Sequence, residues 1–153
     1  MSDVFVAGSL RHAPREWWKI YENIAKLVKE LGYTVHVPHI DTLNEINRGE
    51  EDLHNPDLDI EIRTKAYQAN FEAIRKAKLM IAEVTRPSTG TGVEIQFAMQ
   101  LKKKIICLAN KDADVTSMIL GPANLGMIEM IRYNDEEDAL AKLRELLSNL
   151  SIS

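Results

Sequence analysis

Short apolar runs alternate along this chain with longer stretches in which apolar residues recur at helical spacing. The short runs predict five buried strands, at residues 4–7, 33–37, 79–82, 104–108 and 127–132. The longer stretches predict amphipathic helices over residues 17–31, 57–77, 92–101 and 139–150. The helix over 57–77 is expected to be capped by Asp57 or Asp59.

Strands that are separated by helices predict a parallel sheet with helices on both faces. We therefore expect an α/β fold, a flavodoxin/Rossmann-like three-layer sandwich with strand order 2-1-3-4-5, in a single domain over residues 1–153. In such sheets ligands bind beyond the carboxyl ends of the strands, where the strand order reverses. The loops at residues 8–15 and 83–92 lie there, and the irregular stretch 40–56 has the length of a functional lid or mobile loop.

Composition narrows the class of protein. Charged residues make up 27% of the chain and apolar residues 45%, which is typical of a globular domain. Cys107 is the only cysteine, which excludes an intrachain disulfide and a cysteine-based zinc site. The net charge of -4 argues against nucleic acid as a partner. No apolar run approaches the ~20 residues of a membrane span, and no signal peptide is recognisable, so we expect a cytoplasmic protein without a membrane partner.

The first of the two loops carries three residues suited to an anion. Gly8 allows close approach of a ligand to the backbone, Ser9 offers a hydroxyl, and the planar guanidinium of Arg11 suits a phosphate. The alternative is an ordinary strand-to-helix turn with a solvated arginine.

The second loop, residues 85–94, is rich in Gly, Ser and Thr and opens a helix. Free amides and the helix dipole make such a position an anion site. The loop lacks the Gly-Lys-Ser/Thr ending of a P-loop, and a flexible linker is the alternative.

Glu94 shares helical spacing with Phe97, Ala98 and Leu101, which directs its carboxylate toward the sheet. A carboxylate on an apolar stripe is costly unless it is paired or used in chemistry, which favours a functional role over a simple helix N-terminal acid. Asn70 is also expected to face inward, either at a site or as an amide that ties down a neighbouring loop. His36 and His39 form a weak metal pair and are better interpreted as structural or substrate-contacting residues.

Two segments carry a resemblance to a known family. Residues 5–11 (FVAGSLR) and residues 82–94 (AEVTRPSTGTGVE) resemble the nucleoside 2-deoxyribosyltransferase superfamily, and within it the 2'-deoxynucleoside 5'-phosphate N-hydrolases. The second string is the specific one, and the likeness extends from the first strand to about Tyr133.

The resemblance implies a hydrolase that cleaves the N-glycosidic bond of (deoxy)nucleoside 5'-monophosphates without a metal or organic cofactor. Glu94 would be the nucleophile that forms a glycosyl ester, as in retaining glycosidases. The phosphate ligands would include a hydroxyl from residues 116–118 supplied across a homodimer interface. The implied substrate-binding residues are Phe5, Gly8, Ser9, Leu10, Arg11, Tyr21, His39, Ser88, Gly90, Thr116, Ser117 and Met118, with Glu94 and Asn70 as catalytic residues.

Two positions depart from the family pattern. Phe5 replaces a common tyrosine whose phenol helps to orient the nucleophile, and its absence could make room for a ribose 2'-hydroxyl. Asn70 replaces a common aspartate that serves as the acid partner of the leaving base, and an amide cannot donate a proton as an acid. A deoxyribosyltransferase and a catalytically weakened nucleotide-binding protein are the alternatives.

Overall fold

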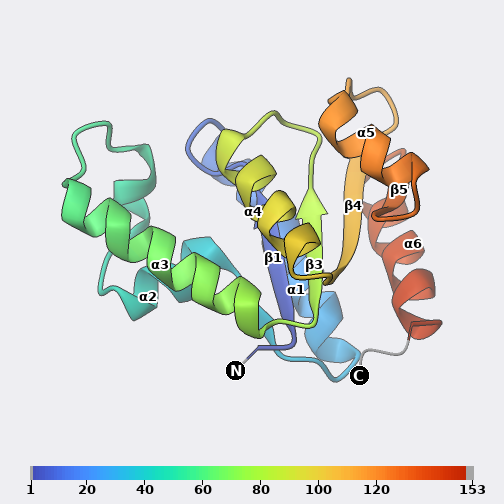
Figure 1. Cartoon of the computed structure of the whole chain (residues 1–153), viewed down its shortest axis with the longest axis horizontal. Coiled ribbons are helices and arrows are strands. Elements are labelled where there is room, and N and C mark those ends of the chain that lie inside the picture. Colours follow the sequence, from blue (N-terminus) through green and yellow to red (C-terminus); the bar gives the residue numbers. More distant parts are fainter. Residues whose placement is uncertain (1, 151–153) are drawn as a thin grey trace.

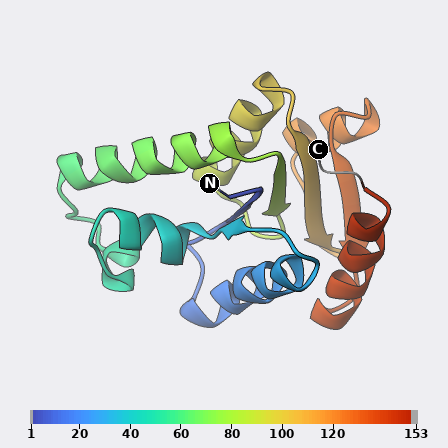
Figure 2. The same ribbon diagram turned by 90° about the horizontal axis from the view of Figure 1, so that it is seen from below.

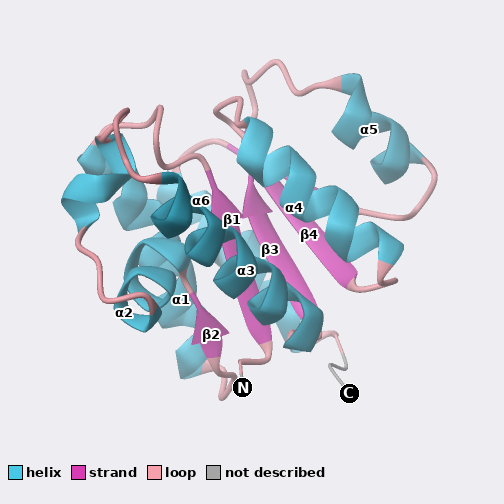
Figure 3. Ribbon diagram, turned by 60° about the vertical axis from the view of Figure 1, so that its left-hand side comes forward, coloured by secondary structure: helices cyan, strands magenta, loops and turns pink. Residues whose placement is uncertain are grey.

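The computed structural model describes residues 2–150. Its five strands form one parallel sheet in the order β2-β1-β3-β4-β5, which confirms the predicted α/β fold and strand order (Figure 1, Figure 3). The strands are β1 (Val4–Gly8), β2 (Val35–His36), β3 (Leu79–Glu83), β4 (Lys104–Asn110) and β5 (Glu129–Tyr133).

Helices cover both faces of this sheet, and side chains that alternate along the strands form a separate core on each face. Val4, Val6 and Ile81 pack with the helices on one face, and Phe5, Ala7 and Met80 pack with those on the other. Figure 2 shows the sheet between the two layers. The first layer holds α1 (Lys19–Glu30) and α6 (Glu136–Ser148), and the second holds α3 (Ile60–Lys76), α4 (Thr89–Gln100) and α5 (Ser117–Asn124). No helix within residues 2–150 is long and apolar enough to cross a bilayer.

Several boundaries differ from the expected ones. α4 begins at Thr89 rather than near residue 92, because the Ser88 hydroxyl caps it by accepting a hydrogen bond from the Thr91 amide (3.2 Å). α5 was not predicted, since Gly121 and Pro122 interrupt its pattern. β2 pairs over two residues instead of the predicted five. Asp59, one of the two expected caps, accepts from the Glu61 amide at the start of α3.

The expected loop at residues 40–56 folds into short helical turns. They are η2 (Pro38–Thr42), which is a single π turn, α2 (Leu43–Glu45) and η3 (Glu50–His54). Like η3, the turn η1 (Arg15–Trp18) is a 3-10 turn, and it precedes α1. The turns of residues 38–54 pack beside the N-terminal part of α3 (Figure 1).

Gly8 ends β1, and the space where its side chain would lie is filled by Tyr21 of α1. A Cβ built at residue 8 would lie 2.3 Å from the Tyr21 ring and 2.6 Å from its hydroxyl oxygen. The same hydroxyl donates a 2.7 Å hydrogen bond to the Ser9 carbonyl. The glycine is therefore required by the core side of the loop, whereas the sequence alone suggested a requirement on the ligand side.

We expect Gly8→Ala to lower the free energy of unfolding by about 1–3 kcal/mol, because overpacking a filled core has this effect. Urea denaturation would measure the change. Gly121→Ala is the matched control, since nothing lies within 4 Å of a Cβ at that position. Equal stability of the two variants would contradict the close packing of Tyr21 on Gly8.

Candidate active site

A cavity of about 460 Å³ opens where the carboxyl end of β1 meets the N-terminus of α4 and the middle of α3. This is the predicted position, between strands one and three of the sheet. The β1 loop, α3 and the α4 N-terminus contribute predicted site residues to its lining, namely Gly8, Ser9, Leu10, Arg11, Asn70, Ser88, Gly90 and Glu94. Leu53, Tyr67 and Phe71 add apolar surface, as is usual in small-molecule sites.

Glu94 lies on the side of α4 that faces this cavity. Its side chain is half-buried and makes no hydrogen bond or ion pair with any of residues 2–150. Loss of water around the carboxylate raises the pKa of Glu94 to about 8. An unpaired carboxyl group in a cleft with a strongly raised pKa is a candidate for chemistry, because perturbed pKa values cluster at functional sites.

Other residues of the lining are suited to an anion. Ser88 caps α4, and the Gly90 amide lies in the first helical turn, where backbone N–H groups have no intrahelical acceptor. The Ser9 hydroxyl makes no hydrogen bond within residues 2–150. Arg11 is exposed, pairs with no carboxylate of the described residues, and donates only to the Asn55 carbonyl (3.3 Å). Two hydroxyls, a helix N-terminus and a guanidinium thus belong to the lining of the same cavity as Glu94.

Asn70 both lines the cavity and holds a neighbouring turn. Its Oδ1 accepts a 2.5 Å hydrogen bond from the Thr42 hydroxyl, at the end of η2. The sequence had offered these roles as alternatives, and the structure combines them in one half-buried side chain.

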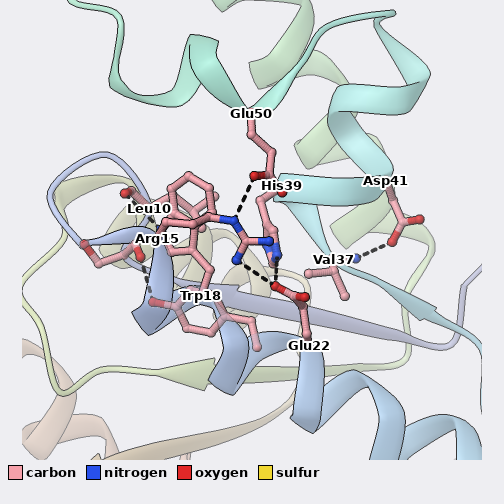
Figure 4. Close-up of polar contacts among 10 residues, drawn as sticks. Leu10, Arg15, Trp18, Glu22, Val37, His39, Asp41 and Glu50 are labelled. Carbon is pink, nitrogen blue, oxygen red and sulfur yellow. Dashed lines mark hydrogen bonds and ion pairs between the residues drawn. The ribbon is translucent and has the colours of Figure 1, made fainter.

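Three predicted substrate contacts do not reach the cavity. Phe5 is fully buried and stacks on His36 with ring centroids 5.4 Å apart. Tyr21 is buried beneath Gly8, as described above. His39 is buried and donates from Nε2 to the Glu22 carboxylate (3.0 Å), which also accepts from Arg15 (Figure 4). These three side chains are buried in the core and do not line the cavity.

Thr116, Ser117 and Met118 lie on the other side of α4 and are exposed. Thr116 and Met118 line a second cavity of about 650 Å³, which shares Ser88, Thr89, Thr91 and Val93 with the first one. Within one chain, these three residues do not line the cavity that contains Glu94.

Sequence reasoning did not identify the group that anchors the Ser88 loop. Glu83 ends β3 and is buried, and it accepts hydrogen bonds from the Tyr133 hydroxyl and from the Thr85 amide (2.5 Å). Burial raises the pKa of Glu83. The sequence signal that could have identified Glu83 is an acidic residue directly after four apolar strand residues. Within residues 2–150, no cluster of three or more His, Cys, Asp or Glu side chains could hold a metal ion.

Comparison with known proteins places these observations in a family. The model of the nucleoside 2-deoxyribosyltransferase family matches residues 4–149. The 5-hydroxymethyl-dUMP N-hydrolase of Esox lucius is 32% identical over 152 residues, covering 97% of each chain. The human enzyme of that name is 29% identical over 136 residues, covering 88% of this chain and 73% of its own. The structure of the CMP N-glycosidase of Clostridium botulinum superposes with a TM-score of 0.64 at 25% identity, covering 92% and 96%.

The raised pKa of Glu94 predicts a pH-dependent stability. The folded protein binds the Glu94 proton more tightly than the unfolded chain. Protonation of Glu94 therefore stabilises the folded protein at low pH, and this stabilisation is lost as pH rises from about 4.5 to about 8. Relative to Glu94→Gln, the wild type should lose about 2–5 kcal/mol of unfolding free energy across this window, at ~1.4 kcal/mol per pKa unit. Urea denaturation at several pH values would test this, and parallel curves for the two proteins would contradict it.

Proposed function

The chain belongs to the nucleoside 2-deoxyribosyltransferase family, and from this premise we propose that it hydrolyses the N-glycosidic bond of nucleoside 5'-monophosphates. The products are a free base and ribose or deoxyribose 5-phosphate. The observation that carries the proposal is the position of one desolvated carboxylate, Glu94, in the same cavity as an anion site. The names of the relatives, two nucleotide N-hydrolases and a CMP N-glycosidase, support the same reaction.

The anion site favours a nucleotide over a free nucleoside. Ser9, Arg11, Ser88 and the Gly90 amide offer more donors than a sugar hydroxyl could use, and a phosphate can accept from all of them. The phosphate would fix the sugar so that C1' lies near Glu94, and orientation of this kind lowers the barrier to attack. Tyr67 and Phe71 offer apolar surface to the base.

The reaction proceeds in two steps at C1'. In the first, an oxygen of ionised Glu94 attacks C1', the bond to the base nitrogen breaks, and the base leaves with the electron pair and gains a proton. In the second, water attacks C1', the ester bond breaks with its electron pair returning to Glu94, and the water gives up a proton. Because the pKa of Glu94 is raised to about 8, its carboxyl group must first lose its proton to water at neutral pH, after which no salt bridge has to be broken before attack.

A homodimer with shared sites is part of this proposal. Thr116 and Ser117 do not line their own cavity with Glu94, yet they are exposed beside it. In a dimer they can donate hydroxyls to the phosphate bound by the other subunit, with Met118 packed at the contact. The exposed apolar residues Val93, Met118 and Leu125 around α4 and α5 are compatible with burial against a second copy.

No metal or organic cofactor takes part in the proposed reaction, since a carboxylate and water are sufficient. The proposal also includes a cytoplasmic location, where the buried free thiol of Cys107 would stay reduced. Phe5 is fully buried and does not line the cavity, so its missing phenol gives no ground for a preference between ribonucleotides and deoxyribonucleotides.

We expect purified protein to release free base from one or more members of a panel of ribo- and deoxyribonucleoside monophosphates, followed by chromatography. Glu94→Gln should abolish turnover while nucleotide binding, measured by calorimetry, is retained. Arg11→Met should raise KM, with Arg144→Met as the control, since Arg144 lies in α6 and pairs with Glu30.

Tight binding without base release by the wild type would indicate a nucleotide-binding protein. A new nucleoside formed after a second base is added would indicate a transferase.

Shared sites predict that two inactive forms complement each other. Glu94→Gln supplies intact hydroxyls, and a Thr116→Val/Ser117→Ala variant supplies an intact nucleophile. Each mixed dimer then has one complete site, so activity at low substrate should exceed the sum of the separate proteins. Activity equal to that sum after subunit exchange would show that each chain works alone.

A further inference from the structure

Three side chains from separate elements form a hydrogen-bonded array that ends in the cavity. Nε2 of His36, in β2, lies 2.7 Å from the hydroxyl of Thr42, and that hydroxyl lies 2.5 Å from Oδ1 of Asn70 in α3. His36 and Thr42 are buried, whereas Asn70 lines the cavity together with Glu94. The array therefore links the core to the surface that a substrate would contact.

The direction of the array decides what Asn70 offers to a ligand. Because the Thr42 hydroxyl has one proton, it can donate to Asn70 or to His36 but not to both. When it donates to Asn70 Oδ1, His36 must donate from Nε2, and the Asn70 NH2 group is left for the cavity. In the opposite direction, Asn70 would present its carbonyl oxygen.

The surroundings of His36 hold the ring in place. The ring is buried and stacks on Phe5 at an interplanar angle of 10°, and its Nε2 bonds the Thr42 hydroxyl. Burial lowers the pKa of His36 despite the opposing effect of Asp41 and Glu45, which leaves the ring neutral at pH 7 with one N–H. The hydrogen bond from Thr42 to Asn70 Oδ1 corresponds to the tautomer with that proton on Nε2.

We propose that His36 and Thr42 are positioning residues that hold the Asn70 amide with its NH2 group toward the leaving base. The inference rests on the proposed function, because a leaving base is what this donor would serve. Cleavage of the C1'–N bond moves an electron pair onto the base, and a fixed N–H donor stabilises the charge that develops there. Asn70 transfers no proton, so the base takes its proton from water. A carbonyl oxygen in the same place would repel the developing charge.

The test compares leaving groups in the Thr42→Val variant, which is nearly isosteric but lacks the hydroxyl. For a natural nucleoside monophosphate, kcat should fall about 10–100-fold with KM nearly unchanged, because removing the partner of a buried polar group has an effect of this size. The 4-nitrophenyl glycoside of ribose 5-phosphate, whose leaving group needs no hydrogen bond, should be cleaved at a nearly unchanged rate. Thr42→Ser should restore the natural reaction. Equal losses on both substrates would indicate a merely structural role and overturn the proposal.

A second measurement does not depend on activity. Nitrogen-15 NMR of the wild type, with the His36 signals assigned from His36→Gln, should show the tautomer protonated at Nε2. A His36 protonated at Nδ1 would overturn the proposal, because the array would then run toward His36. If no nucleotide releases its base, the proposed function fails, while the tautomer still decides whether the array orients Asn70 as inferred.

Discussion

The site depends on one unfavourable arrangement, a half-buried carboxyl group, Glu94, with no positive partner among the described residues. α4 packs Thr91, Ile95 and Ala98 in its buried stripe and places Glu94 beside that stripe, facing the cavity, and Ser88 fixes where the helix begins. A desolvated carboxylate is destabilising by itself, so the rest of the fold must hold it there. The buried Glu83–Tyr133–Thr85 contacts contribute by anchoring the loop that leads into α4.

The sequence predicted the α/β fold and the strand order because the signals for strands and helices are local and periodic. The apolar runs marked β1, β3 and β4 closely, and the alternation of strands with helices led to the observed strand order. The prediction missed α5, whose Gly121 and Pro122 are unfavourable in helices and whose apolar residues give no clear stripe. It also overextended β2, because residues with strand propensity at a sheet edge need not pair.

The candidate site was predictable where the chain itself carries the chemistry. Glu94, Ser88 and Arg11 were found from residue type and position, and the structure places them around one cavity. Phe5 and Tyr21 came from resemblance alone, whereas His39 was also interpreted from the residues as structural or substrate-contacting; all three are buried and do not line the cavity. Sequence spacing could not reveal that Thr42 reaches Asn70 across 28 positions, since this contact depends on how the turns at residues 38–54 pack on α3.

The pairing of Gly8 with Tyr21 has a consequence for comparisons within the family. Since the ring occupies the volume of the missing side chain, the two positions cannot vary independently. A relative with alanine or serine at the first position has to carry a smaller or displaced residue at the second. Its loop would then lose the phenol that holds the Ser9 carbonyl. Joint substitution at this pair would thus mark relatives in which the loop at residues 8–15 has another conformation.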